Sequence, residues 1–116
     1  MSTPSPSAET VSSRVAELMP ALLEDLSSLV AIPSVALPGF PPEPVHRMGE
    51  AVVDLLRRSG ATNARLLPIP HGYPAVWAEI PGPEGAPTVT LHAHYDVQPA
   101  PTAETSKPSA AADPSR

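Results

Sequence analysis

Residues 88–99 decide the expected class of fold, and they read Thr88-Val89-Thr90-Leu91-His92-Ala93-His94-Tyr95-Asp96-Val97-Gln98-Pro99. The first four residues alternate threonine with aliphatic side chains, which predicts a β-strand. Side chains alternate between the two faces of a strand, so His92, His94 and Asp96 would project to one side if the chain stays extended. Neutral imidazole is a metal ligand, and a carboxylate either ligates or orients the ring. The stretch therefore predicts a metal site at the carboxyl end of a strand.

The composition limits the chain to one small domain, since it has 116 residues. Its formal net charge of −5 argues against binding to nucleic acid and against attraction to an anionic membrane. It has no cysteine, so disulfides, thiol nucleophiles and cysteine-bound zinc are excluded. The amino terminus lacks the features of a secretory signal, and no apolar run is long enough to span a membrane. We therefore expect a cytoplasmic protein.

An amphipathic helical segment is expected early in the chain. Residues 1–10 are rich in serine, threonine and proline without branched aliphatics, which predicts a disordered arm. An apolar stripe at helical spacing then runs from Val11 to Val30. Pro20 lies inside it, so either the helix kinks there or a second helix begins with Pro20 in its first turn. Ile32-Pro33 ends the segment, because a residue before proline is pushed out of helical geometry.

A proline-rich connector, residues 33–44, leads to a second predicted helix. Pro44 suits the first helical position, and apolar residues at helical spacing follow it. Arg57 and Arg58 complement the negative end of the helix dipole. Gly60 suits the left-handed conformation that ends many helices. The pattern predicts a helix that ends just before Gly60.

Three strand candidates follow the helices. They are residues 64–69, an edge strand interrupted by Pro68, residues 75–80, which alternate well, and residues 88–93, which return after a turn at 81–87. Helices followed by strands predict an α/β fold with two or three helices and two or three strands.

An ordered series of segments across residues 13–100 resembles the M20 family of zinc metallopeptidases. The segment His94-Tyr95-Asp96-Val97-Gln98-Pro99 is similar to the first metal-ligand motif of that family. Its residues 95–99 resemble the dipeptidase branch in particular. Residues 22–35 are similar to the opening helix of the family, and residues 59–61 and 74–80 follow in the expected order. A series of matches in order is less easily accidental than one short motif.

The resemblance implies a role for the residues of the motif. His94 would bind one of two zinc ions, with cobalt or manganese as alternative metals, and Asp96 would be the active-site carboxylate that fixes its imidazole. The substrate would be a small peptide or an aminoacyl compound, whose peptide or amide bond is hydrolysed by zinc-activated water. Ala93 stands where the family usually has glycine, and His92 has no counterpart among the family's ligands.

The family's remaining ligands and its general base come after this motif. Here residues 99–116 follow, with no Val, Ile, Leu, Met or aromatic residue, and we expect them to be disordered. One ligand and its carboxylate cannot complete a catalytic zinc site. We therefore expect residues 11–98 to be a partial M20-like catalytic domain. The chain would be an amino-terminal fragment with a truncated or frame-shifted end, inactive by itself.

Other interpretations of the same residues stay open. His94 and Asp96 are also compatible with a solvated strand end whose side chains satisfy nearby backbone groups. The chain is also compatible with a non-enzymatic interaction module that docks a partner through the apolar face of the first helix. If that face is uncovered, it favours self-association or binding by a chaperone. Trp77 lies at an alternating strand position and is expected in the core.

Overall fold

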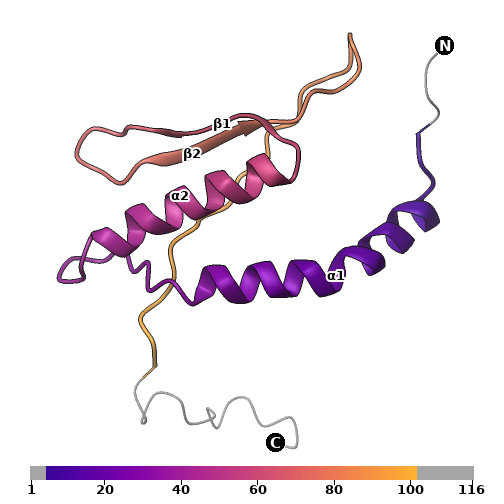
Figure 1. Ribbon diagram of the computed structural model, residues 1–116. Helices are drawn as coiled ribbons and strands as arrows, with labels where there is room; N and C mark the ends of the chain where they lie inside the picture. The colour runs from indigo at the N-terminus through magenta and orange to yellow at the C-terminus, as the bar shows by residue number, and fades with distance from the viewer. Residues whose placement is uncertain (1–4, 102–116) are drawn as a thin grey trace, which may run out of the picture.

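The computed structural model describes residues 5–101, which form two helices and one small sheet (Figure 1). The elements follow one another as α1 (Ala8–Val30), α2 (Glu43–Arg58), β1 (Thr62–Leu67) and β2 (Ala75–Glu79). The two strands pair antiparallel. This is a small mixed α/β arrangement, as the sequence predicts at the level of fold class.

The first helix is continuous through Pro20, and Figure 1 shows it bent along its length. It begins earlier than expected, at Ala8, so the predicted disordered arm over residues 1–10 is wrong for its last three residues; residues 1–4 lie outside the described part. The cause is a cap: Thr10 N–H donates to Ser7 Oγ at 3.2 Å, which satisfies a free donor of the first turn. Glu9 in that turn adds a favourable interaction with the helix dipole.

The second helix carries the core. The helix begins at Glu43, one residue before the predicted start, so Pro44 is its second residue and still lies in the first turn. Gly60 follows its end with φ of 94°, as predicted. The buried apolar side chains are few: Val35 in the connector, Pro44, Val45, Met48 and Val53 on α2, and Ala64 on β1. The core therefore lies between α2, the sheet and the connector before α2. α1 contacts α2 but neither strand, and none of its residues is buried.

The sheet differs from the prediction in its first strand, which starts two residues earlier than residues 64–69 and ends before Pro68. Thr62 pairs with Glu79 and Arg65 with Trp77, so the register shifts between these pairs. Asn63 lies in the shift with φ of 52°, a conformation that asparagine tolerates better than most residues. β2 ends one residue before the predicted segment 75–80 does.

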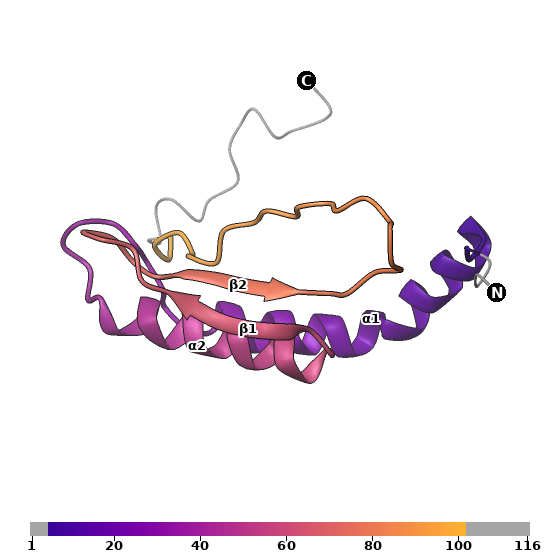
Figure 2. The ribbon, with the colours of Figure 1, turned by 90° about the horizontal axis from the view of Figure 1, so that it is seen from above.

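The predicted third strand, residues 88–93, is not a strand. Figure 2 shows the chain after β2 turning back past the sheet as an open loop. Among the described residues, none forms β-sheet pairing with residues 88–93. Val89 and Leu91 alternate as a strand would, yet they are 78% and 86% exposed. Alternation alone does not make a strand, because the backbone donors and acceptors need a neighbouring strand. Trp77 is 43% exposed, so its expected place in the core is also wrong.

No helix within residues 5–101 combines the length and the apolar character needed to cross a membrane.

Candidate functional site

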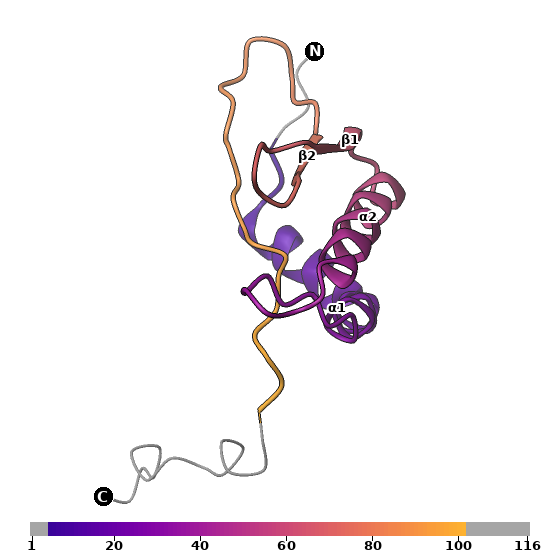
Figure 3. The same ribbon diagram turned by 90° about the vertical axis from the view of Figure 1, so that its left-hand side faces the viewer.

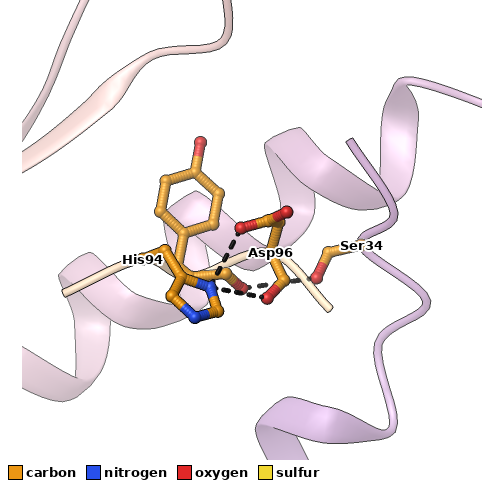
Figure 4. Close-up of polar contacts among 4 residues, drawn as sticks. Ser34, His94 and Asp96 are labelled. Carbon is orange, nitrogen blue, oxygen red and sulfur yellow. Dashed lines mark hydrogen bonds and ion pairs between the residues drawn. The ribbon is translucent and has the colours of Figure 1, made fainter. Parts of the chain in front are cut away.

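The two predicted site residues, His94 and Asp96, lie side by side in the structure (Figure 4). Nδ1 of the imidazole is 3.1 Å from Asp96 Oδ1 and 3.2 Å from the backbone oxygen of the same residue. A backbone carbonyl oxygen only accepts hydrogen bonds, so Nδ1 carries the hydrogen and donates to both oxygens. In the neutral ring, Nε2 then holds the free lone pair. This is the tautomer that a ligand binding metal through Nε2 requires.

Tyr95, between the two residues, anchors this segment to the rest of the fold. Its hydroxyl donates to the backbone oxygen of Pro74 at 2.7 Å. Its ring lies against Gly49 of α2, where an added Cβ would be 3.6 Å from the tyrosine oxygen. Burial raises the pKa of Tyr95 above its ordinary value, and the nearby charge of Asp96 and the neighbouring Tyr73 raise it further.

The other side of the segment is held by Ser34 in the connector between the helices. Val97 N–H donates to the Ser34 backbone oxygen at 3.0 Å, and Ser34 Oγ lies 3.5 Å from the backbone oxygen of Tyr95. Ser34 is fully buried. The connector is tightly bent here, since Ser34 N–H donates to the Ile32 oxygen and Val35 N–H to the Pro33 oxygen. A residue 61 positions before Tyr95 in the chain therefore helps to fix the backbone on which His94 and Asp96 lie.

The pair itself faces solvent. The His94 side chain is 81% exposed and the Asp96 side chain 40% exposed. His92 is also exposed and has no hydrogen bond to either residue within the described part of the chain. The alternating spacing therefore places His94 and Asp96 together, but it does not bring His92 into the same cluster.

A metal fits this arrangement at one ligand position only. An exposed imidazole with a free Nε2 and a carboxylate on Nδ1 has the chemistry of a single oriented ligand. Over residues 5–101, however, no three side chains of His, Asp or Glu come close enough together to hold a metal ion. A catalytic zinc site normally needs three protein ligands. The described residues thus supply one ligand of such a site and not the complete set.

Sequence reasoning missed the residues that position the pair, namely Ser34, Gly49 and Tyr95. One signal for Gly49 was present: a glycine inside a helix is unfavourable, and it often marks a close approach of another group. Ser34 follows Ile32-Pro33, which indicated only the end of a helix. Its contact with residues 95–97 depends on the fold and leaves no local pattern in the sequence.

A second feature lies away from the motif, at the end of α2. Glu50, Val53, Arg57, Arg65 and Leu66 line an open hollow of about 220 Å³. Arg57 donates to the Ala64 backbone oxygen at 2.9 Å, so this arginine ties the end of α2 to β1 in addition to complementing the helix dipole. Arg58 pairs with Asp54 one turn earlier, at 3.1 Å on the exposed surface.

No protein-family model matches the chain, and neither a curated protein nor a solved structure matches it.

Proposed function

We propose that this chain carries the first metal-ligand segment of a zinc-dependent dipeptidase or aminoacyl hydrolase of the M20 type. The observation that supports it is that Nδ1–H of His94 donates to two oxygens of Asp96. This leaves Nε2 free, on an exposed ring held by an orienting carboxylate. The ordered similarity of residues 13–100 to that family supplies the substrate class, a small peptide or aminoacyl compound. In this proposal His94 is the ligand and Asp96 the residue that orients it.

The residues of this chain bind and orient but do not complete a reaction. When bound in such a site, zinc activates water and polarises the scissile carbonyl. Asp96 keeps the imidazole in one tautomer, while Tyr95 and Ser34 hold the backbone on either side. Within residues 5–101 no group of three His, Asp or Glu side chains could hold a metal ion. We therefore propose that the 116-residue chain, tested alone, does not hydrolyse peptides.

The metal proposal is tested by titrating zinc into the full chain and following the imidazole resonances by NMR, with cobalt as a paramagnetic probe. Zinc is expected to shift the His94 ring most strongly, with weak affinity because one ligand binds it. Asp96→Ala should weaken binding about 10-fold or more, as the loss of an orienting carboxylate does in metal sites. His92→Ala is the control and should leave binding unchanged. Equal binding by the His94→Ala variant would contradict the proposal.

A second candidate function is a non-enzymatic interaction module that uses the apolar face of α1. The observation that favours it is that α1 has no buried residue, although it carries eight large apolar side chains that are at least 38% exposed. Large uncovered apolar patches usually mark interaction sites. The dye 1-anilinonaphthalene-8-sulfonate, which fluoresces on exposed apolar surface, should bind the chain at low concentration. Leu22→Lys combined with Leu26→Lys should abolish the fluorescence, whereas Ser13→Lys should not.

A further inference from the structure

The face of α1 carries a continuous row of exposed apolar side chains, called here the α1 stripe. Its members are Val11, Val15, Leu18, Met19, Leu22, Leu23, Leu26 and Val30, each between 38% and 55% exposed. In Figure 3 the carboxyl-terminal part of α1 lies beneath α2, and α1 contacts neither strand. Most helices in proteins owe their stability to burying such an apolar face rather than to helix propensity. The stripe therefore needs a cover that the described residues do not provide.

Residues 1–7 and 99–116 carry little apolar surface that could cover the stripe. Residues 99–116 contain no Val, Ile, Leu, Met or aromatic side chain, and Met1 is the single large apolar residue before Ala8. The exposed Val89 and Leu91 belong to the open loop beyond the sheet, and α1 contacts no element except α2. A second α1 stripe is an apolar surface of matching length and character.

We propose that two copies of this chain associate through their α1 stripes, with the two helices antiparallel. This inference rests on the second function proposed above, names its partner, and is independent of the metal site. When the two stripes overlap fully in this direction, Val15 of one copy opposes Leu26 of the other, and Leu18 opposes Leu23. The overlap extends over most of a helix about 35 Å long. Such a contact is isologous, so it closes as a dimer and leaves no free stripe.

The charges beside the stripe select the antiparallel direction. Arg14 and Asp25 are eleven residues apart, about three helical turns, so both border the same edge of the stripe. In an antiparallel pair each edge faces the same edge of its partner. The position of Arg14 in each copy then differs from that of Asp25 in the other copy by about 3 Å, measured along the helix axis. A parallel pair would place this edge against the opposite one, which carries Ala16 and Ser27. Arg14 already pairs with Glu17 of its own helix at 3.0 Å on the exposed surface. An antiparallel partner brings Asp25 to the same arginine, twice in the dimer, whereas a parallel partner does not.

Sedimentation equilibrium of the full chain over a concentration series tests the association. The wild-type chain is expected to form dimers, and Leu22→Lys should weaken them by more than about tenfold, because it buries a charge at the centre of the contact. Ser13→Lys adds the same charge on the opposite face and should leave the dimer unchanged. A monomer at every concentration overturns the proposal. If that monomer still binds the apolar dye through the stripe, the interaction module stands with another partner, and if it does not, both fail.

Charge reversal and cross-linking test the direction. Arg14→Glu and Asp25→Arg should each weaken the dimer about threefold, and the double variant should recover it, as expected for exposed ion pairs. Within one copy the two residues are about 16 Å apart along the axis, so recovery reports a contact between copies. Because the chain has no cysteine, Val15→Cys and Leu26→Cys chains can be mixed and oxidised. A disulfide between the two variants supports the antiparallel pair, whereas disulfides formed only within each variant overturn it.

Discussion

Nδ1 of His94 forms hydrogen bonds with two oxygens of Asp96, and these bonds determine which ring nitrogen carries the hydrogen in the neutral imidazole. We expect the neutral ring to carry its hydrogen mainly on Nδ1, as both distances require. Asp96→Ala removes the carboxylate and leaves only the backbone oxygen, so the Nδ1–H population should fall. Nitrogen-15 NMR of the imidazole measures the two tautomers directly. His46, which instead packs edge-on against Tyr73, is the internal reference and should not change. An unaltered tautomer ratio at His94 would show that the carboxylate plays no part.

The hydroxyl of Tyr95 makes one partly buried hydrogen bond, to the Pro74 backbone oxygen. Tyr95→Phe keeps the ring against Gly49 but leaves that oxygen without this donor. The free energy of unfolding should fall by about 1 kcal/mol, the usual net value of such a bond. Urea denaturation at neutral pH measures this change. Tyr73→Phe is the control, since no hydrogen bond of the Tyr73 hydroxyl is present in the described part of the chain. A loss as large in the control would assign the effect to general packing instead.

The raised pKa of Tyr95 also predicts a pH dependence. Burial, Asp96 and Tyr73 all favour the neutral phenol in the folded chain, whereas the unfolded chain ionises near its ordinary pKa of about 10. The stabilising contribution is therefore fully present below pH of about 10, and it is lost as pH rises through the folded pKa. The Tyr95→Phe variant lacks this group, so its stability should fall less steeply above pH 10 than that of the wild-type chain. Parallel curves for the two chains would contradict the assignment.

At the scale of elements, α2 packs closely against β1 and residues 94–97 at Gly49. An added Cβ there would lie 3.1 Å from Leu66 Cδ2 and 3.6 Å from the Tyr95 oxygen, so Leu66 must shift, and the further methyl groups of a branched side chain would crowd the same space. Gly49→Val should therefore destabilise the fold by about 1–3 kcal/mol through overpacking. The same substitution should also break the hydrogen bond from the Tyr95 hydroxyl to the Pro74 backbone oxygen. Thermal unfolding and Tyr95 proton shifts measure the two effects. Glu50→Val introduces the same side chain at the exposed neighbouring position and should cost much less.

The same elements show how far local sequence patterns determine the fold. α2 was predictable because its apolar spacing, early proline and final glycine all agree, and the structure confirms each. β2 was predictable from alternation, since a partner strand is present to pair with it. Residues 88–93 carry the same kind of alternation without a partner, so the pattern could not reveal that they stay an open loop. The start of α1 was missed because its cap, Ser7, lies in a segment that composition alone marks as disordered.

The candidate site divides in the same way. His94 and Asp96 are two residues apart, so their proximity follows from local geometry and was foreseeable. The groups that hold the segment come from the connector, from α2 and from the turn before β2, at Ser34, Gly49 and Pro74. These contacts depend on long-range packing that no periodicity encodes. The sequence therefore predicted the chemistry of the pair but not the supports that position it.

At the scale of the whole molecule, stability depends on a small core, because only six apolar side chains, Pro44 included, are buried among residues 5–101. Chains with few buried apolar groups have little free energy of unfolding to lose. Met48, which is 2% exposed between α2 and the sheet, is one of the largest of them. Met48→Ala should cost about 2–5 kcal/mol, the usual range for a buried methionine. Such a loss is large enough to unfold most of the chain at room temperature.

Circular dichroism and urea titration of the Met48→Ala variant test this expectation. Helical signal is expected to fall sharply, and the segment at 94–97 should lose its fixed shifts at the same time, since its anchors belong to the core. Leu37→Ala removes a comparable side chain that is 50% exposed, so it should change stability by less than about 0.5 kcal/mol. If both variants behave alike, the buried residues do not form the cooperative core of the molecule. The position of His94 and Asp96 would then not depend on the packing of α2.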